Sequence, residues 1–194
     1  MDKIAIGRLL RSSITGCVVG CNLSQANTPA FGQMVLIPLD SKTSIYGLVY
    51  DIHVDDDGLV RQLVTSSNIS AAVIEDNRVN RNVPLEMSVV FTGYESDGRI
   101  SHLLPPRPPL TLDSIYPCSP AELARFTADG RFAYLRHLLR DEELPVAELI
   151  AVHLREVIAA NPSNAADAVE TVIALLKDDY PQLMDVLSAV SEVY

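Results

Sequence analysis

Three consecutive aspartates followed by a glycine, Asp55-Asp56-Asp57-Gly58, are the residues whose type and spacing most suggest a metal site. A calcium loop of the EF-hand kind needs oxygen ligands at its positions one, three, five and twelve, with glycine at position six. If Gly58 occupies position six, His53 falls at position one and Val64 at position twelve. Valine offers no side-chain oxygen and histidine is a poor calcium ligand, so the loop lacks its bidentate carboxylate.

The alternative for the same segment needs no metal. Asp57-Gly58 is a favoured two-residue turn between strand-like residues 50–54 and 59–63. The neighbouring aspartates then solvate the tip of the hairpin. We therefore predict a turn here and not a metal site.

Three cysteines, Cys17, Cys21 and Cys118, do not form a disulfide framework, because their number is odd and their spacing irregular. Cys17 and Cys21 lie four residues apart in a strand pattern, so they face the same side at a separation of about 13 Å. That distance is too long to chelate one zinc ion, whose bonds to sulfur measure about 2.3 Å. We expect both cysteines to be core residues of a cytoplasmic protein.

The four histidines, His53, His102, His137 and His153, form no pair at metal-ligand spacing. His153 lies on the apolar face of a predicted helix, near Ile150 and Val157. Two interpretations stay open for it: a buried histidine held by a hydrogen bond, or part of a pH-sensitive interface.

Motifs that bind nucleotides or activate a serine are absent: there is no G-x-x-x-x-G-K-[ST], no G-x-G-x-x-G and no G-x-S-x-G. We therefore predict no catalytic, cofactor-binding or metal-binding residue, no cofactor and no enzyme activity. An enzyme with scattered site residues is a third hypothesis, and its best candidates are Asp51, His53, Asp55 and His102.

Charge is unevenly distributed along the 194 residues, whose formal net charge is −10. Residues 1–110 carry a net charge of −2 and residues 111–194 carry −8. Such a chain would repel a phosphate backbone, so direct nucleic-acid binding is disfavoured. No apolar run approaches the roughly 18 residues needed to span a bilayer, and the N-terminus lacks a signal-peptide pattern, so we expect a soluble cytoplasmic protein.

The first part of the chain alternates between apolar and polar residues, with frequent turn residues, as β-rich chains do. We predict strands at 4–10, 14–21, 33–39, 43–54, 88–94 and 99–103, and weaker strands at 59–65 and 71–74. Strands of this length and spacing favour a small closed barrel, because closure removes exposed edges.

The last part of the chain is predicted to be helical. Ser119-Pro120-Ala121-Glu122 has the pattern of a capping box with proline at the first helical position. Further helices are expected from Gly130 to Arg140, from Pro145 to Ala160, over 164–178, and from Pro181 onward. Each of the last two helices carries an apolar stripe that needs a partner surface. The stripe of the first consists of Ala165, Val169, Val172, Ile173 and Leu176. The stripe of the second consists of Leu183, Val186, Leu187 and Val190.

Four prolines within residues 105–109 lie at the boundary between these two compositions. We interpret this segment as a stiff spacer rather than as a peptide ligand for an aromatic groove. The predicted fold class is α+β with segregated parts: a small closed β-barrel over residues 1–104, a connector over 105–118, and an α-helical bundle over 119–194.

Three segments of the first part carry a family resemblance: Ile6-Gly7-Arg8-Leu9-Leu10-Arg11-Ser12-Ser13, Phe31-Gly32-Gln33-Met34-Val35-Leu36-Ile37 and Ile45-Tyr46-Gly47-Leu48-Val49-Tyr50-Asp51-Ile52. Their succession over residues 3–105 resembles the HerA–ATP synthase barrel, or HAS barrel. That barrel precedes the motor core of HerA-type hexameric ATPases, where it supports ring assembly and partner docking. Here no Walker motif follows the barrel, so no nucleotide-binding residue is carried over from the family.

Together these features predict a non-catalytic protein-interaction or assembly module of a bacterial cytoplasm, accessory to a larger complex that the resemblance suggests is an ATPase. Its partner would be another protein or a second copy in a homo-oligomer, and not a membrane. The alternative is a barrel that binds a small ligand or a nucleic acid.

Overall fold

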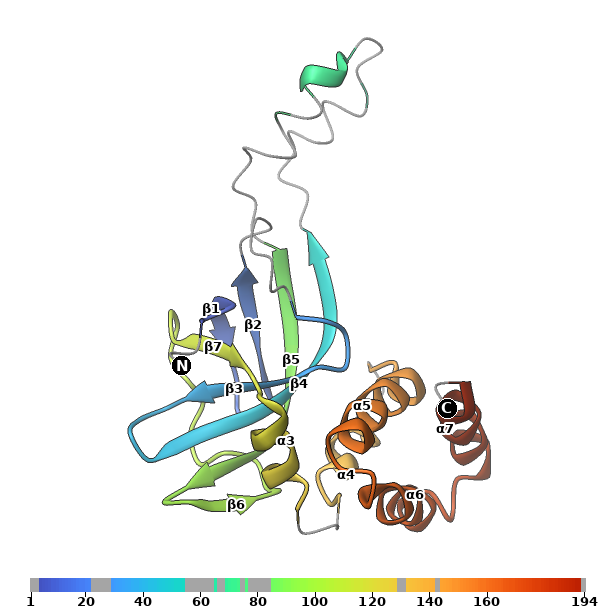
Figure 1. Cartoon of the computed structure of the whole chain (residues 1–194). Helices are drawn as coiled ribbons and strands as arrows, with labels where there is room; N and C mark the ends of the chain where they lie inside the picture. Colours follow the sequence, from blue (N-terminus) through green and yellow to red (C-terminus); the bar gives the residue numbers. More distant parts are fainter. Residues whose placement is uncertain are drawn as a thin grey trace.

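A computed structural model describes residues 4–21, 29–54, 65, 69–73, 76, 85–128, 132–141 and 144–192. Its strands precede its main helices in the sequence (Figure 1). The strands are β1 (Gly7–Ser12), β2 (Gly16–Cys21), β3 (Met34–Pro38), β4 (Thr43–Val54), β5 (Leu85–Ser96), β6 (Arg99–Ser101) and β7 (Ser114–Pro117).

Six of these strands close into an antiparallel barrel, which confirms the predicted barrel. The order around the ring is β2-β1-β7-β3-β4-β5, and β2 pairs again with β5 from Gly16↔Val90 to Cys21↔Leu85. Strand β6 lies outside the ring and pairs with β5 across the turn at Asp97-Gly98, as predicted. Closure leaves the six ring strands without a free edge over their paired residues.

The last barrel strand follows the proline-rich segment, which differs from the predicted boundary after residue 104. Strand β7 pairs with β1 through Gly7↔Ile115 and with β3 through Val35↔Pro117. Residues 102–113 therefore form a loop between two strands of one sheet. The change in composition predicted the wrong end for the barrel, because the proline- and leucine-rich segment is a loop. The chain passes through this loop before β7 closes the barrel.

The barrel interior is filled by alternate residues of the strands, as the period of two requires. Cys17, Val19 and Cys21 point inward from β2, and the other members of this core are Ile6, Leu9, Val35, Ile37, Ile45, Val49, Met87, Val89, Phe91 and Ile115. Strands β4 and β5 shift register between Tyr46 and Gly47. A Cβ at Gly47 would lie 2.5 Å from Val89 Cγ1, so only glycine fits this close approach.

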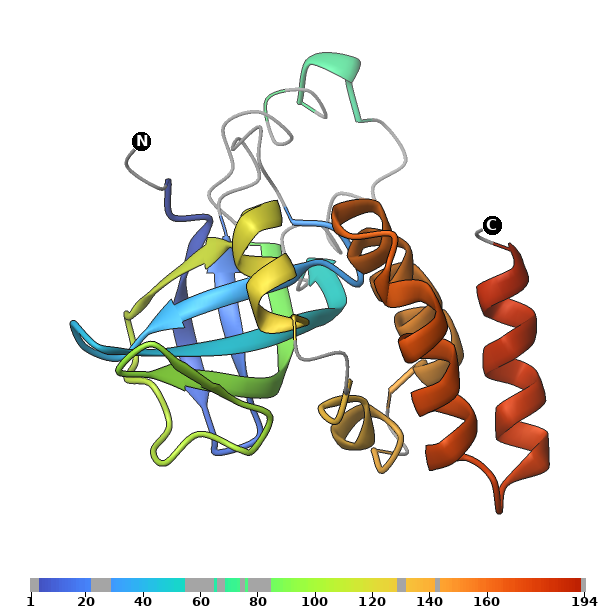
Figure 2. The ribbon, with the colours of Figure 1, turned by 60° about the horizontal axis from the view of Figure 1, so that its bottom comes forward.

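The helices are α3 (Pro120–Phe126), α4 (Leu135–Leu138), α5 (Val146–Ala160), α6 (Asn164–Leu175) and α7 (Tyr180–Glu192). Helix α3 begins with the predicted capping box: Glu122 N donates to Ser119 Oγ, and Ser119 N donates to the Glu122 carboxylate. Figure 2 shows α5, α6 and α7 gathered on one side of the barrel, with α7 farthest from it.

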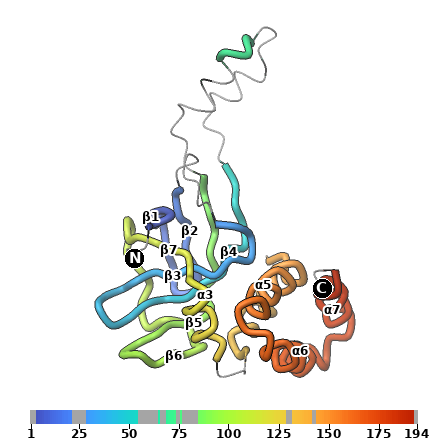
Figure 3. Tube along the Cα trace, in the orientation of Figure 1, coloured from blue at the N-terminus to red at the C-terminus, as the bar shows by residue number. Residues whose placement is uncertain are grey.

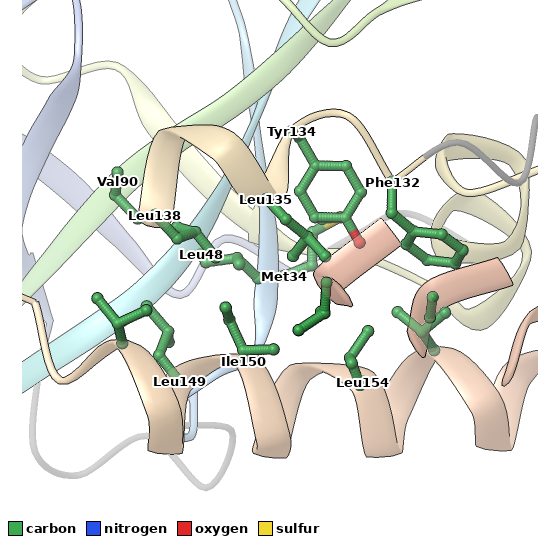
Figure 4. Packing of buried hydrophobic residues seen from close by; sticks show 14 of the residues in the cluster. Met34, Leu48, Val90, Phe132, Tyr134, Leu135, Leu138, Leu149, Ile150 and Leu154 are labelled. Atoms are coloured by element: carbon green, nitrogen blue, oxygen red, sulfur yellow. The ribbon is translucent and has the colours of Figure 1, made fainter. Parts of the chain in front are cut away.

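The barrel and the helices share one hydrophobic core. Met34, Leu48 and Val90 of the barrel belong to the same buried cluster as Leu138 and Leu149 of α4 and α5 (Figure 4). Gly32 contributes to this contact, because its φ of 81° suits glycine and a Cβ there would lie 2.7 Å from Val152 Cγ1 of α5. The predicted succession of strands and helices is thus present, but the helices pack on the barrel and do not form a bundle apart from it.

Two smaller predictions differ from the structure, and a third concerns residues that the structure does not describe. Residues 71–73 are helical and not a strand. The apolar stripe of α6 is also displaced: Ala168 and Val172 are buried, whereas Ile173 is 45% exposed. The turn at Asp57-Gly58 and the partner strand at 59–63 lie outside the described residues; Val54 pairs with Leu85 on β5.

The shared core predicts that the barrel and the helices unfold together. Leu149→Ala on α5 should lower the free energy of unfolding by about 2–5 kcal/mol, because Leu149 is fully buried at the contact. Urea unfolding followed by far-UV and near-UV circular dichroism should give coincident transitions, both shifted. Ile173→Ala, at an exposed position, should cost less than about 0.5 kcal/mol. A barrel transition that stays in place while the helical signal shifts would contradict the shared core.

Candidate functional site

The acidic and histidine residues named for an enzyme do not converge. Asp51 Oδ2 and His53 Nδ1 lie 2.8 Å apart near the end of β4, with both side chains about half exposed. His53 is in register with Glu86 of β5, whereas Ser101, next to His102, is in register with Tyr94. Glu86 and Tyr94 are eight residues apart on β5, so His53 and His102 lie at strand positions separated by roughly 26 Å. Asp55 lies outside the described residues, and no group of three or more metal-ligating side chains occurs among those described.

Cys17 and Cys21 are buried in the barrel, as predicted, and neither forms a disulfide. Burial raises the pKa of the Cys17 thiol to about 12 and also raises that of Cys21. Since the thiolate is the nucleophilic form, these cysteines pack and do not react.

His153 is a buried histidine with a hydrogen bond, which is the first of the two interpretations left open by the sequence. Tyr134 Oη lies 2.7 Å from His153 Nε2, and both side chains are 0% exposed. Burial lowers the pKa of His153 to about 4, and the backbone of Gly32 opposes this to a smaller extent. The imidazole is therefore neutral at pH 7, and it joins α5 to the loop before α4.

His102 also has a structural position between the barrel and the helices. Its Nε2 lies 3.0 Å from the carbonyl oxygen of Phe126, and its own carbonyl accepts hydrogen bonds from Arg136 and His137. The rings of Phe126 and Tyr134 lie within 5.1 Å of the His102 ring. This histidine therefore fixes the chain directly after β6 against the end of α3.

A polar hollow separates the turn between β1 and β2 from the end of α4. It consists of two adjoining cavities of about 340 and 430 Å³ that share Thr15, Val90 and Asp141. Arg11 lines the first cavity and Arg140 the second. Neither guanidinium forms an ion pair with any residue that the structure describes. The hollow is therefore lined by two arginines and by one carboxylate, that of Asp141, which belongs to both cavities.

An exposed apolar patch lies where β1 meets the loop before β7, and we call Leu10, Leu110 and Leu112 the loop patch. Leu110 is 73% exposed, Leu112 64% and Leu10 39%. Leu112 N donates to Leu9 O at 2.8 Å, which places Leu112 beside the bulged residue Leu10 of β1. Large side chains exposed together on a surface mark contact sites more often than single ones do.

Several hydrogen bonds hold the loop that carries the patch. Arg8 Nη1 donates to Leu112 O at 3.0 Å, and Ser12 Oγ donates to Pro109 O at 2.6 Å. Leu110 N donates to Asp113 Oδ2 at 2.7 Å within the loop. Both ends of the patch are thus held against β1, and the four prolines of residues 105–109 restrict the backbone further.

Leu112 has a backbone φ of 72°, in the left-handed region that glycine occupies without strain. A non-glycine residue there costs about 1–2 kcal/mol, and Leu112, which is 64% exposed, recovers little of it by burial. The fold alone would favour glycine at this position, so the leucine points to a use outside the fold.

Comparisons with known proteins give no match to this chain, neither among models of protein families nor among curated proteins. No helix within the described part of the chain is long and apolar enough to cross a membrane.

The proline-rich segment is visible in the sequence, but the exposure of its leucines is not. Leucines at 103, 104, 110 and 112 bracket the prolines, which was the available signal. Their exposure depends on the return of the chain to β1 through β7, and that pairing is not visible in the sequence.

The burial of His153 predicts a loss of stability at acidic pH. The unfolded chain binds a proton near pH 6.5, but the folded chain binds it only near pH 4, so unfolding becomes more favourable as the pH falls through this window. The contribution is about 3 kcal/mol. His153→Gln, which retains a partner for Tyr134, should flatten the pH dependence of the free energy of unfolding between pH 6.5 and 4. The exposed His53→Gln should keep most of the slope; equal slopes for all three proteins would contradict the assignment.

Proposed function

We propose that this chain is a non-catalytic protein-interaction module that docks through the loop patch. The observation that carries the proposal is Leu112, a 64% exposed leucine held in a left-handed backbone conformation. Strain retained at a position without a packing role is expected where a side chain serves recognition.

The loop patch has the properties of a preorganised docking element. Its hydrogen bonds to Arg8, Leu9 and Ser12 order the loop before any partner arrives, so binding loses less conformational entropy. Apolar side chains at the centre of such a site supply most of the binding free energy, and nearby polar groups form the rim.

The class of partner is proposed from the resemblance. HAS barrels support assembly of hexameric ATPases, so a barrel-bearing ATPase of a bacterial cytoplasm is the expected protein partner. The closed six-stranded barrel is compatible with this class of partner, and the buried thiols of Cys17 and Cys21, which form no disulfide, are compatible with a reducing compartment.

The test is capture of partners by wild-type chain and by the double variant Leu110→Ser, Leu112→Gly. Leu112→Gly removes the side chain at a backbone conformation that glycine prefers, so the melting temperature should stay the same or rise slightly. Tagged proteins are incubated with native, nuclease-treated extract, and bound proteins are quantified by mass spectrometry. A partner held by wild type should fall about tenfold or more with the variant.

The matched control is Ile173→Ser, Met184→Ser, which removes two other exposed apolar side chains. It should retain the partner. Equal retention by the loop variant and the control would exclude the loop patch as the docking element.

A second candidate function is binding of a small anionic ligand in the hollow lined by Arg11 and Arg140. Two guanidinium groups without ion-pair partners among the described residues favour it, and the single carboxylate of Asp141 opposes it in part. Pyrophosphate at millimolar concentration should raise the melting temperature of wild type and should not do so for Arg140→Gln. An absence of any shift with wild type would remove this candidate.

A further inference from the structure

A β-bulge in β1 sets the direction of two neighbouring side chains. Leu9 faces the barrel interior and pairs with Val19 of β2. Arg11 pairs with the next residue of β2, Val18, so Leu10 is an extra residue on β1. In a regular strand Arg11 would share the inward face with Leu9, because side chains alternate. The bulge instead leaves Leu10 and Arg11 next to each other and exposed on the outside of the barrel.

This bulge makes the loop patch and the polar hollow continuous. Leu10 belongs to the loop patch, and the next residue, Arg11, lines the first cavity of the hollow. Ser12 lines the same cavity, and its Oγ donates to Pro109 O, directly before Leu110. Figure 3 shows the two paired strands β1 and β2 side by side in the barrel, away from α7. One ligand can therefore contact both surfaces at once.

The charged groups around this combined surface leave one guanidinium free beside the leucines. Arg8, Arg11 and Arg140 lie there together with Asp113 and Asp141. Arg8 donates to a backbone carbonyl of the loop, and Asp113 accepts a backbone hydrogen bond within it. Asp141 reaches the hollow from the segment after α4. The Arg11 side chain forms neither an ion pair nor a hydrogen bond with the described residues. A carboxylate is the group that a free guanidinium next to an apolar surface recognises best.

We propose that the loop patch and the hollow form one docking surface for a short segment of a partner protein that combines apolar and acidic residues. Apolar side chains of the segment contact Leu10, Leu110 and Leu112, and a neighbouring carboxylate pairs with Arg11. Arg140, in the second cavity, adds attraction at longer range. The anion that the hollow accepts then belongs to the partner.

The inference rests on the proposed function, because both use the loop patch, and it adds the chemistry of the partner. The leucines supply most of the affinity, as apolar side chains at the centre of an interface do. The arginine supplies selectivity, because a segment without a carboxylate leaves it unpaired at the edge of the contact.

The experiment selects partner segments from a phage-displayed library of random peptides panned on the immobilised full chain. Enriched peptides are synthesised, and their affinity is measured by fluorescence polarisation at low and high salt. We expect enriched sequences to carry apolar residues beside an aspartate or glutamate. Their affinity should fall in high salt, because salt screens exposed charges.

Variants of the chain then locate the contact. Arg11→Gln should weaken the acidic peptide about tenfold or more, and Arg140→Gln about two- to threefold. The double variant Leu110→Ser, Leu112→Gly should also weaken it about tenfold or more. A peptide with the matching amide in place of its acidic residue should bind wild type and Arg11→Gln equally, because the interaction is already lost.

Arg99→Gln is the matched control, since Arg99 is an exposed strand arginine on β6 that lines neither cavity. It should bind the peptide as wild type does. The melting temperature of each variant is measured to show that it is folded.

Three outcomes would overturn the inference: a selection that enriches no peptide, enriched peptides without acidic residues, or an affinity that Arg11→Gln leaves unchanged. Peptides without acidic residues that still depend on Leu110 and Leu112 would overturn only the chemistry of the partner and leave the proposed function standing. Peptides that depend on Arg11 but not on the two leucines would place binding in the hollow alone, against both proposals.

Discussion

Closure of the barrel is the constraint on which the rest of this structure depends. An open sheet of these strands would leave the backbone of β1 and β3 unpaired, and only β7 satisfies both. The chain must therefore cross from β6 to the far side of β1 before it can begin the helices. The proline-rich loop is that crossing, and its hydrogen bonds to β1 follow from where the crossing ends.

The contact between barrel and helices is the second consequence of closure. Because β7 ends at Pro117 beside β3, helix α3 begins next to the outer face of β3 and β4. Phe126 of α3 stacks on Tyr46 at 4.5 Å between ring centroids, and Tyr134 continues the aromatic contact towards His153. Tyr46 Oη also donates to Glu95 and accepts from Arg125, so the polar end of this ring is satisfied. This part of the outer barrel face, on β3, β4 and β5, is thereby buried by the chain's own helices.

The surface proposed for interaction is one that stays exposed after this burial. The loop patch stays exposed because the loop lies over β1, on the side that no helix covers (Figure 1). A groove lined by Ala147, Asp185 and Ala189, among others, also stays open, because α7 packs mainly on α5 and leaves its acidic side to solvent.

Sequence by itself determined most of the strands, the helix starts and the character of the cysteines, because these depend on local periodicity, on capping and on thiol spacing; it missed β7 and predicted a strand at 71–74, where residues 71–73 are helical. The range of β4, the capping box at Ser119 and the inward cysteines of β2 are confirmed for this reason. It also excluded the common nucleotide and serine motifs, whose residues are contiguous. Only the tertiary structure decided that the barrel closes with β7, that the helices share its core, and that Leu110 and Leu112 face solvent. Those properties arise from pairing between residues about a hundred positions apart, as in Gly7↔Ile115, and local pattern carries no signal for such a pairing.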